Sequence, residues 1–431
     1  MKFESIACEV KEASLKLAAI DADTKNKALT HIAQALKNRS KEIMDANKED
    51  IERSQKENLA APLLKRLKFD EAKLDDVISG INALINMEDP VGKVLFTTEL
   101  DEGLDLYKVT CPIGVIGVIF ESRPDALVQI SMLCLKSGNG VLLKGGSEAI
   151  NTNRVLTEII TQASEEAGIP SGWIKLLETR ADVTEMLKMD EYIDLLIPRG
   201  SNDFVRYIME NTKIPVMGHA DGICHCYVDD AADIDMAVKI VNDSKTQYVS
   251  VCNATETLLV HRKIAKDFLP ALKKELDKKQ VVLMGCNETK AIIPVLDATD
   301  EDWKTEYLEY KLSIKIVGSI DEAIEHINKY GSGHTDAIIT SNGKNAAHFM
   351  DMVDSGNVFW NCSTRFSDGY RYGFGAEVGI STGKLHARGP VGLDGLLSYK
   401  YKLIGNGHIV EDYANKTKTF KHRKVNKEFP L

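Results

Sequence analysis

The fold of this chain is decided by the stretch Cys111-Pro112-Ile113-Gly114-Val115-Ile116-Gly117-Val118-Ile119-Phe120. Its aliphatic residues run on without alternating polar ones, a pattern typical of a strand buried on both faces of a sheet. A helix is expected over about 125–136, and after the turn at 137–140 a second buried strand follows at 141–144. Strands that alternate with helices at this spacing predict a parallel sheet with right-handed crossovers, the architecture of nucleotide-binding folds.

The alternation continues in two units. The first has a helix over about 151–167 and expected strands at 174–177, 193–197 and 214–217. The second begins near Asp229, and its expected elements are strands at 280–284, 313–317, 336–340 and 357–360 and helices over 233–245, 263–276, 321–329 and 342–353. We therefore expect two α/β domains in succession.

Composition bounds the class of protein. The chain has 431 residues, 44% of them hydrophobic and 27% charged, which is typical of a soluble globular protein of two or three domains. Its net charge of −10 argues against a general nucleic-acid binder, and no run reaches the ~18 apolar residues of a membrane span. The eight cysteines lack the spacing of a disulfide framework and the N-terminus lacks a signal peptide, so we expect a cytoplasmic enzyme with reduced thiols.

Two parts of the chain stand outside the alternating units. Residues 3–87 predict a set of packed helices, because apolar residues recur there at helical spacing. Residues 94–110 predict a hairpin, which needs another domain or subunit to pack on. A last strand is expected at 396–403, and the basic tail over 415–431 is expected to be flexible.

One thiol stands at the end of a rigid element. In the stretch Ser250-Val251-Cys252-Asn253-Ala254-Thr255-Glu256-Thr257-Leu258-Leu259-Val260 a turn presents Cys252 just before a buried strand. This position favours a nucleophile, because a group that is already held in place meets a smaller entropic barrier to attack. The alternative is a small buried apolar residue, the usual role of a free cysteine.

The first unit contains no G-x-G-x-x-G, so the phosphates of any dinucleotide must bind elsewhere. Pro198-Arg199-Gly200-Ser201-Asn202 is a candidate, because it places a glycine turn before a helix N-terminus, which attracts anions. An ordinary strand-to-helix turn with an N-cap explains the same residues equally well.

Four stretches together resemble one family. They are Pro112–Pro124, Pro215–His225, Val251–Val260, and Ser363–Gly369 continued by Gly375–Val378 and Lys384–Pro390. These motifs are similar to those of the gamma-glutamyl phosphate reductases (glutamate-5-semialdehyde dehydrogenases), within the aldehyde dehydrogenase superfamily. The likeness runs from the N-terminal helices to about residue 408 and leaves out only the tail.

The resemblance implies an aldehyde-dehydrogenase-like α/β fold of three parts. These are an NADP-binding Rossmann-like domain over 1–93 and 111–228, a catalytic domain over 229–375, and a small β oligomerisation element over 94–110 and 395–410. It also implies a homo-oligomeric oxidoreductase with NADPH as cofactor. The implied reaction is the reduction of L-glutamate 5-phosphate to L-glutamate 5-semialdehyde with release of phosphate, the second step of proline biosynthesis from glutamate.

The resemblance makes Cys252 the nucleophile, which forms a thioester with the acyl group. The superfamily's usual second donor to the oxyanion is an asparagine, and Ser122 stands at that position here, so the second donor is left open. The stretch His219–Cys224 contains no glutamate that could activate water. This fits a phosphorylating enzyme, in which hydrolysis would waste the thioester.

The resemblance also implies a set of cofactor-binding residues. They are Lys144 and Ser147 at the adenosine ribose, Gly200 and Ser201 at the pyrophosphate, and Glu306 at the nicotinamide ribose. The ribose-binding glutamate of the superfamily is replaced by Ser147, and Glu148 is displaced by one position. A lysine beside a neutral hydroxyl favours a 2′-phosphate, so NADPH is expected to be preferred over NADH.

The substrate carries a carboxylate and a phosphate, which require cations. Arg123, Arg365 and Arg388 are the candidates, because a guanidinium binds such groups in a fork. A surface or structural role is the alternative for each of them.

No metal site is expected. One group of histidines and cysteines is too crowded for normal zinc ligand loops: His219, Cys224, His225 and Cys226. A CoA-acylating aldehyde dehydrogenase is the alternative activity, because it would also lack the general base, and a scaffold without activity is a further alternative. Since an acyl phosphate hydrolyses easily, a transient contact with a glutamate 5-kinase is also expected.

Overall fold

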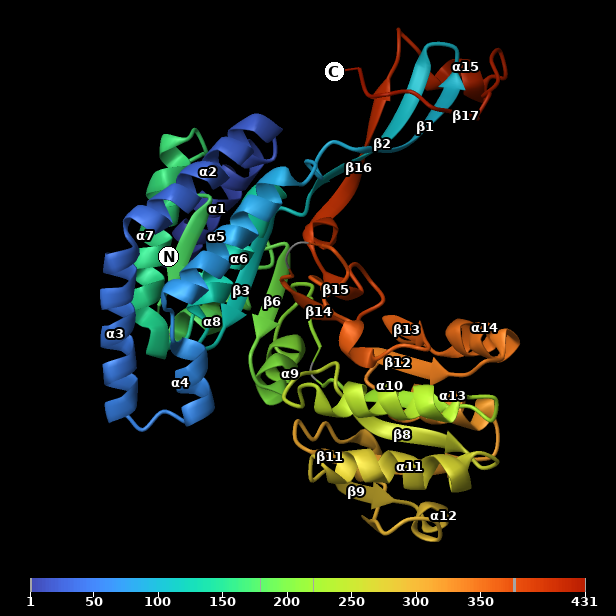
Figure 1. Ribbon diagram of the computed structural model, residues 1–431. Coiled ribbons are helices and arrows are strands. Elements are labelled where there is room, and N and C mark those ends of the chain that lie inside the picture. Colours follow the sequence, from blue (N-terminus) through green and yellow to red (C-terminus); the bar gives the residue numbers. More distant parts are fainter. Residues whose placement is uncertain (1, 179, 220, 375–376, 431) are drawn as a thin grey trace.

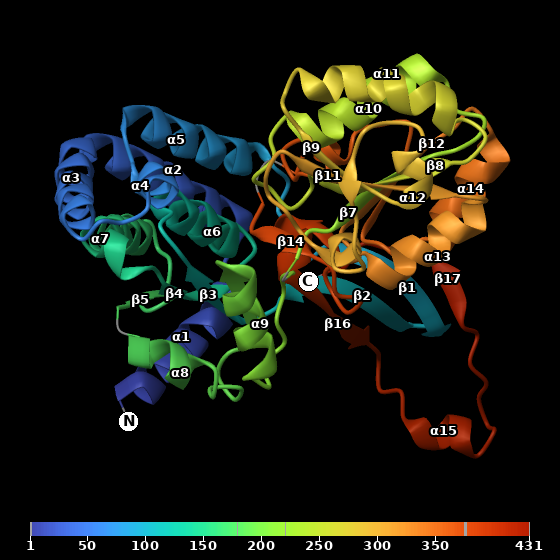
Figure 2. The same ribbon diagram turned by 90° about the horizontal axis from the view of Figure 1, so that it is seen from below.

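The computed structural model describes residues 2–178, 180–219, 221–374 and 377–430. Figure 1 shows two α/β lobes beside each other and a small sheet that projects away from both. The same arrangement seen from below has the helices of each lobe on the outside of its strands (Figure 2). The predicted boundaries at residues 1, 375 and 431 lie outside the described residues.

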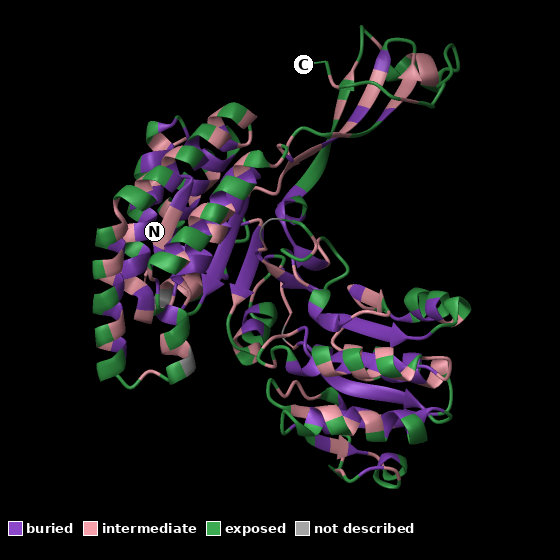
Figure 3. Ribbon diagram, viewed as in Figure 1, coloured by how far each residue is buried: buried purple, intermediate pink, exposed green. Residues whose placement is uncertain are grey.

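The first lobe is built on a four-stranded parallel sheet with the order β5-β4-β3-β6. Its strands are β3 (Val115–Phe120), β4 (Gly140–Lys144), β5 (Ile174–Leu177) and β6 (Leu195–Arg199). All six residues of β3 are buried, as the apolar run predicts, and Figure 3 shows the same for the centre of the sheet. The strand expected at 214–217 forms only one bridge, Leu196 to Val216, because Pro215 has no N–H with which to continue a ladder.

Nine helices of the described chain pack around this sheet. They are α1 (Lys2–Leu17), α2 (Ala22–Asn38), α3 (Ser40–Lys56), α4 (Ala61–Leu67), α5 (Glu71–Asn86), α6 (Pro124–Lys136), α7 (Ile150–Glu166), α8 (Arg180–Met186) and α9 (Asn202–Glu210). Apolar side chains of α2, α5, α6 and α7 share one core with β3 and β4, which also includes the fully buried Trp173. The predicted N-terminal helices are therefore part of the first domain.

The second lobe contains a seven-stranded parallel sheet with the order β10-β9-β11-β8-β7-β12-β13. Its strands are β7 (Cys224–Val228), β8 (Thr255–His261), β9 (Val282–Gly285), β10 (Leu296–Asp297), β11 (Lys311–Val317), β12 (Thr335–Ile339) and β13 (Asn357–Trp360). Its helices are α10 (Ile234–Thr246), α11 (Ala265–Asp277), α12 (Asn287–Lys290), α13 (Ile320–Tyr330) and α14 (Gly343–Met352). The predicted second α/β domain is present.

The predicted boundary between residues 228 and 229 is wrong. β7 pairs with both β8 and β12, so Cys224–Val228 lies in the middle of the second sheet. All five of its residues are buried. The sequence did not predict this strand because cysteine and histidine fill three of its positions, and neither has the β-branched apolar character by which buried strands are recognised.

After β13 the chain returns to the first lobe. β14 (Gly379–Ser381) pairs antiparallel with β15 (Gly389–Val391), and Val378, Val391, Leu393 and Leu396 join the core of the first lobe. The segment from β14 to β15 therefore connects the second lobe back to the core of the first lobe. β16 (Leu397–Ile404) then leaves the lobe for the projecting sheet.

The projecting sheet has the order β16-β2-β1-β17. β1 (Val94–Asp101) and β2 (Leu104–Pro112) form the predicted hairpin, and β16 pairs with β2 along eight residues. The prediction of a flexible tail is wrong, because β17 (Arg423–Val425) pairs with β1 beyond the short helix α15 (Val410–Ala414).

Charge pairing explains the ordered tail. Arg423 lies 2.6 Å from Glu99, and Lys427 lies 2.8 Å from Asp105. The basic character that suggested a solvated tail instead complements the acidic hairpin. Among the described residues, no helix has the combined length and apolar character needed to cross a bilayer.

Candidate active site

Cys252 lies in the turn between α10 and β8, as the sequence predicts. The Ala254 N–H donates to the Val251 carbonyl at 3.1 Å and closes the turn. The Asn253 side chain donates to the Ser367 carbonyl at 2.7 Å, and the Thr364 hydroxyl donates to the Asn253 carbonyl at 2.7 Å. The half-buried thiol is therefore held by a rigid turn, which is the positioning that nucleophilic attack requires.

The surroundings of Cys252 disfavour its thiolate. Burial raises the pKa of the thiol to about 12, and the charges of Glu306 and Glu377 act in the same direction. The Arg199 guanidinium opposes them only in part. The free enzyme therefore holds a protonated thiol at neutral pH, and a base must take the proton before attack.

The raised pKa predicts an unusual pH dependence of alkylation. Only the thiolate reacts, so iodoacetamide labelling of Cys252 should become about tenfold faster per pH unit between about pH 7 and 10 without levelling off. Cys286 is the internal reference, because hydrogen bonds from Ile316 and Thr289 outweigh its burial and lower its pKa. Peptide mass spectrometry gives both rates, and a plateau for Cys252 below pH 10 would contradict the raised pKa.

Gly222 packs directly against the turn that holds Cys252, here called the nucleophile turn. A Cβ atom at this position would lie 2.3 Å from the Cys252 carbonyl oxygen and 2.5 Å from Cys252 Cβ. Its backbone N–H donates to Glu306, whose carboxylate also accepts from Asn202 Nδ2 at 2.7 Å. Glu306 thus joins the beginning of α9 in the first lobe to the backbone beside Cys252.

We predict that Gly222→Ala reduces turnover by about 100-fold or more, because the added methyl group forces Cys252 to move and misplacement by about 1 Å has this effect. Gly218→Ala is the matched control, since the nearest atom to its Cβ lies 3.7 Å away, at ordinary contact distance. Steady-state rates of the two folded variants make the comparison. Equal rates would show that the turn adapts without cost.

Two histidines from different elements flank the thiol. The His219 Nδ1 lies 2.9 Å from the Ile380 carbonyl, which fixes Nδ1 as the protonated nitrogen. His334 lies just before β12 and is fully buried, with its Nδ1 2.8 Å from the Thr335 hydroxyl. Burial is the main cause that lowers the pKa of each imidazole, so both are neutral at physiological pH.

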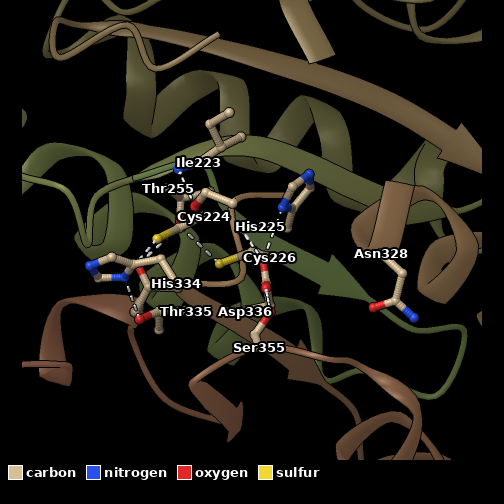
Figure 4. A network of polar contacts seen from close by, with 12 residues as sticks. Ile223, Cys224, His225, Cys226, Thr255, Asn328, His334, Thr335, Asp336 and Ser355 are labelled. Carbon is tan, nitrogen blue, oxygen red and sulfur yellow. Dashed lines mark hydrogen bonds and ion pairs between the residues drawn. The ribbon is translucent and has the colours of Figure 1, made fainter. Parts of the chain in front are cut away.

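The structure divides the crowded group of histidines and cysteines. His225 and Cys226 belong to β7, and His225 Nδ1 bonds Asp336 at 2.9 Å (Figure 4). Cys224 instead donates its thiol to the Cys252 carbonyl at 3.1 Å. His334 is the residue just before β12, and nothing in the sequence near Cys252 identifies it.

The three predicted substrate arginines lie in different surroundings. Arg365 is mostly buried, donates to the Gln247 side chain at 3.0 Å, and lies close enough to Cys252 for the thiolate to raise its pKa, although burial lowers that pKa overall. Arg123 pairs with Asp125 at 3.2 Å. Arg388 pairs with Asp354 at 3.2 Å and also donates to its carbonyl at 2.9 Å, which links the loop before β13 to the returning segment.

Arg199 is a site residue that the sequence analysis did not assign to the substrate. It is the last residue of β6, donates to the Val378 carbonyl at 3.0 Å, and interacts electrostatically with Cys252, Glu377 and Arg123. Burial is the main cause that lowers the pKa of its guanidinium. Arg199 belongs to the stretch 198–202 that the sequence predicts to bind phosphate, so this motif is the signal that could have identified it.

A cleft of about 510 Å³ opens at the carboxyl ends of β3 and β4. Lys144 and Ser147, both predicted to contact the cofactor, line it together with the Gly145-Gly146 turn. Glu148 lines the same cleft, but its Oε1 accepts the N–H of Ser122 at 2.6 Å and the hydroxyl of Ser122 at 2.7 Å. Both donors of Ser122 are therefore engaged away from the thiol.

The predicted pyrophosphate turn borders this cleft. Gly200 precedes Ser201, the N-cap of α9, and a Cβ on Gly200 would lie 2.9 Å from the Phe204 ring. The carboxylate of Glu121 accepts the Ser201 N–H, and burial together with the Glu148 charge raises the pKa of that carboxyl. An acidic group thus already occupies this helix N-terminus, which is the position where a phosphate would bind.

Comparison with known proteins identifies relatives over the whole chain. The family model described as "Aldehyde dehydrogenase family" matches residues 2–313. The gamma-glutamyl phosphate reductase of Acetivibrio thermocellus is 73% identical over 431 residues, covering 100% of this chain and 100% of that protein. The protein of the same name from Pelotomaculum thermopropionicum is 70% identical over 431 residues, covering 100% of this chain and 99% of that protein.

Solved structures agree with these relatives. The crystal structure of gamma-glutamyl phosphate reductase from Thermotoga maritima is similar with a TM-score of 0.93 at 42% identity, covering 95% of this chain and 100% of that chain. An acetylating aldehyde dehydrogenase from Geobacillus thermoglucosidasius, at 18% identity and a TM-score of 0.65, covers 95% of this chain and 97% of that chain and shares the fold. The fold class expected from the sequence is confirmed.

Proposed function

The chain belongs to the gamma-glutamyl phosphate reductases of the aldehyde dehydrogenase family, and on that premise we propose that it reduces L-glutamate 5-phosphate to L-glutamate 5-semialdehyde with NADPH, in proline biosynthesis. It is an oxidoreductase. The observation that carries the proposal is the likeness along the whole chain to enzymes of that name.

Attack by Cys252 begins with removal of its proton. We assign this step to His219, whose neutral ring has a free Nε2 because Nδ1 donates to Ile380. The thiolate bonds to the substrate's acyl carbon while the bond from that carbon to the phosphate oxygen breaks, and phosphate leaves with the electron pair. A thioester on Cys252 remains, and the proton stays on His219.

The oxygen of the acyl group becomes negative during attack and needs fixed donors. The backbone N–H of Cys252 is one candidate, as the sequence already suggests. Ser122 is a poor second candidate, because its N–H and its hydroxyl both donate to Glu148. The second donor therefore has to come from another residue near the turn.

The residues near Cys252 in the stretch 219–224 explain why water would not hydrolyse the thioester. The stretch 219–224 contains no glutamate, and Asp221, its one carboxylate, pairs with Arg206 at 2.7 Å and accepts from Asn202 at 2.9 Å. No carboxylate of this stretch is therefore free to activate a water molecule. Phosphate remains as the exchange partner of the acyl group.

We assign the cofactor to this cleft and its border. Lys144 and Ser147 in the cleft would hold the 2′-phosphate, and Glu306, which lies beside both Cys252 and α9, would hold the nicotinamide ribose. Binding of the pyrophosphate at Gly200 and Ser201 would require the Glu121 carboxylate to release the Ser201 N–H. When bound, NADPH supplies the hydride that converts the thioester to the aldehyde. His219 then returns its proton to the thiolate.

We predict that Ser147→Glu lowers kcat/KM for NADPH by about 10- to 100-fold and leaves the value for NADH less affected, because the new carboxylate faces the 2′-phosphate. Ser147→Gln is the control, since it has the same size without the charge. Initial rates with both cofactors test the prediction. An unchanged NADPH/NADH ratio in Ser147→Glu would remove Ser147 from the ribose site.

Charges around the thiol fit the substrate. Arg199 and Arg365 both interact with Cys252, so they are the arginines we assign to the phosphate and the α-carboxylate. Glu377 lies near the same group and is suited to the α-ammonium. Arg388 is better explained by its pairing with Asp354.

The projecting sheet supports assembly into a homo-oligomer. Large apolar side chains are exposed on it: Leu95, Phe96, Tyr399, Tyr401 and Leu403. Exposure of this kind marks an association surface. Light scattering at micromolar concentration tests the assembly, and a monomer would contradict it.

For the contact with a glutamate 5-kinase, the test is whether the coupled reaction outpaces the separate steps.

The decisive assay runs the reaction in reverse. The purified enzyme should oxidise glutamate semialdehyde only when NADP⁺ and inorganic phosphate are both present, because phosphate must accept the acyl group from Cys252. Replacement of phosphate by CoA tests the CoA-acylating alternative. Oxidation that depends on CoA, or that proceeds without either acceptor, would overturn the proposal.

A further inference from the structure

Three soft metal ligands meet at the nucleophile. The Cys252 sulfur and one ring nitrogen from each of His219 and His334 all lie within 4.8 Å of one another. The two imidazole rings are in edge-to-face contact with their centroids 4.9 Å apart. This set differs from the crowded group in the sequence, because His334 replaces the residues of β7.

The free nitrogens of both histidines are suited to a cation. His219 uses Nδ1 for the Ile380 carbonyl, an arrangement that metal-binding histidines commonly have, and this leaves the lone pair of Nε2. The fully buried His334 engages Thr335 through Nδ1, whereas its Nε2 has no hydrogen-bond partner among the described residues. A buried polar atom without a partner is costly, and coordination would relieve that cost.

Figure 4 shows the ring of His334 beside Cys224 and Thr335, with one nitrogen directed toward them and the other directed away. Charges of both signs surround the cluster, and the cations Arg199 and Arg365 oppose a bound metal ion. Glu306 and Glu377, which disfavour a thiolate at Cys252, favour a cation next to it.

We propose that Cys252, His219 and His334 bind one soft divalent cation, Zn²⁺, and that this binding closes the active site to substrate. Thiolate and imidazole ligands select zinc over magnesium or calcium. Tetrahedral bonds of ~2.0 to 2.3 Å require donors ~3.3 to 3.8 Å apart, so small side-chain movements from the present separation within 4.8 Å complete the site. The fourth position remains open to water.

Binding can be measured without any assay of activity. The full chain is first treated with a chelator, and Co²⁺ alone is then added. A thiolate-to-cobalt charge-transfer band should appear and saturate at one Co²⁺ per chain, and Zn²⁺ should displace the Co²⁺ and remove the band. Cys252→Ser should abolish the band. His334→Asn should weaken Zn²⁺ binding by more than the ~10- to 100-fold that loss of an outer partner causes. Cys286→Ser, a change at another half-buried cysteine, should leave the cobalt band and the Zn²⁺ affinity unchanged.

A second readout uses the unaltered protein, so the test does not depend on folding of the variants. Zn²⁺ should protect Cys252 but not Cys286 from iodoacetamide. Absence of the band, or a band that persists in Cys252→Ser, overturns the site. Affinity unchanged in a folded His334→Asn does so as well.

Closure of the site rests on the proposed function, whereas binding does not. Zn²⁺ should inhibit competitively with glutamate semialdehyde, and a chelator should restore the full rate. Zn²⁺ bound by the spectroscopic criterion without inhibition would overturn closure. A protein that shows the band when Co²⁺ is added, yet never oxidises the semialdehyde once the metal is removed, would instead contradict the reductase activity.

Discussion

Replacement of Cys252 by alanine is expected to reduce turnover by about 10⁴-fold or more, the size of loss seen when a covalent nucleophile is removed. The sulfur alone can carry the acyl group, because the remaining groups at the turn only bind and polarise the substrate. Binding of NADPH should be retained, since the cleft lined by Lys144 and Ser147 lies at the edge of the other sheet. Reverse-direction rates and fluorescence titration with NADPH measure the two quantities.

Cys286→Ala controls for the general effect of removing a half-buried cysteine, and its rate should stay near that of the wild type. Acyl transfer to Cys252 should also be visible directly. Mass spectrometry of enzyme quenched with substrate in the absence of NADPH should find the acyl group on the Cys252 peptide. Substantial turnover by the alanine variant, or an acyl group on another side chain, would mean that the thioester mechanism is wrong.

The largest expected change in stability is at Glu256. Lys245 and Glu256 form an ion pair with 2.5 Å between Nζ and Oε2, and both side chains are fully buried. Burial raises the pKa of the Glu256 carboxyl to about 7 and lowers that of the Lys245 ammonium, so each charge depends on its partner. Glu256→Gln leaves an unpaired buried ammonium, and we expect the free energy of unfolding to fall by about 3–5 kcal/mol.

The same substitution at an exposed pair is the control. Glu288→Gln breaks the bond to Arg262, where both side chains are more than half exposed, and should change stability by only about 0–1 kcal/mol. The double variant Lys245→Met with Glu256→Leu removes both charges and should recover much of the loss. Denaturant unfolding followed by circular dichroism compares them. A loss in Glu256→Gln no larger than in Glu288→Gln would contradict the burial argument.

The same pair connects stability to the active site. Glu256 is the second residue of β8, close after the turn that presents Cys252, and its Oε1 accepts the Leu308 N–H at 3.3 Å. The Glu306 charge acts on the same carboxyl. Weakening this pair is therefore expected to loosen both the nucleophile turn and the backbone next to Glu306.

Several elements were predictable from the sequence and others were not. β3 and β4 were clear because their aliphatic residues are typical of strands buried on both faces. β7 was missed because cysteine and histidine fill it, although it is just as buried. The tail after α15 was expected to be flexible, since charge alone does not reveal that Glu99 and Asp105 lie opposite its basic residues.

The sequence by itself determined the α/β class and the family, and it predicted Cys252 as the nucleophile, because each depends on local residue patterns that can be read along the chain. Only the tertiary structure decided what surrounds Cys252. Arg199 comes from the end of β6 in one sheet, His334 from just before β12 in the other, and Glu377 from the returning segment. Such groups meet because parallel strands end at common sheet edges, and the order of strands across the sheets, unlike the strands themselves, leaves no local pattern in the sequence.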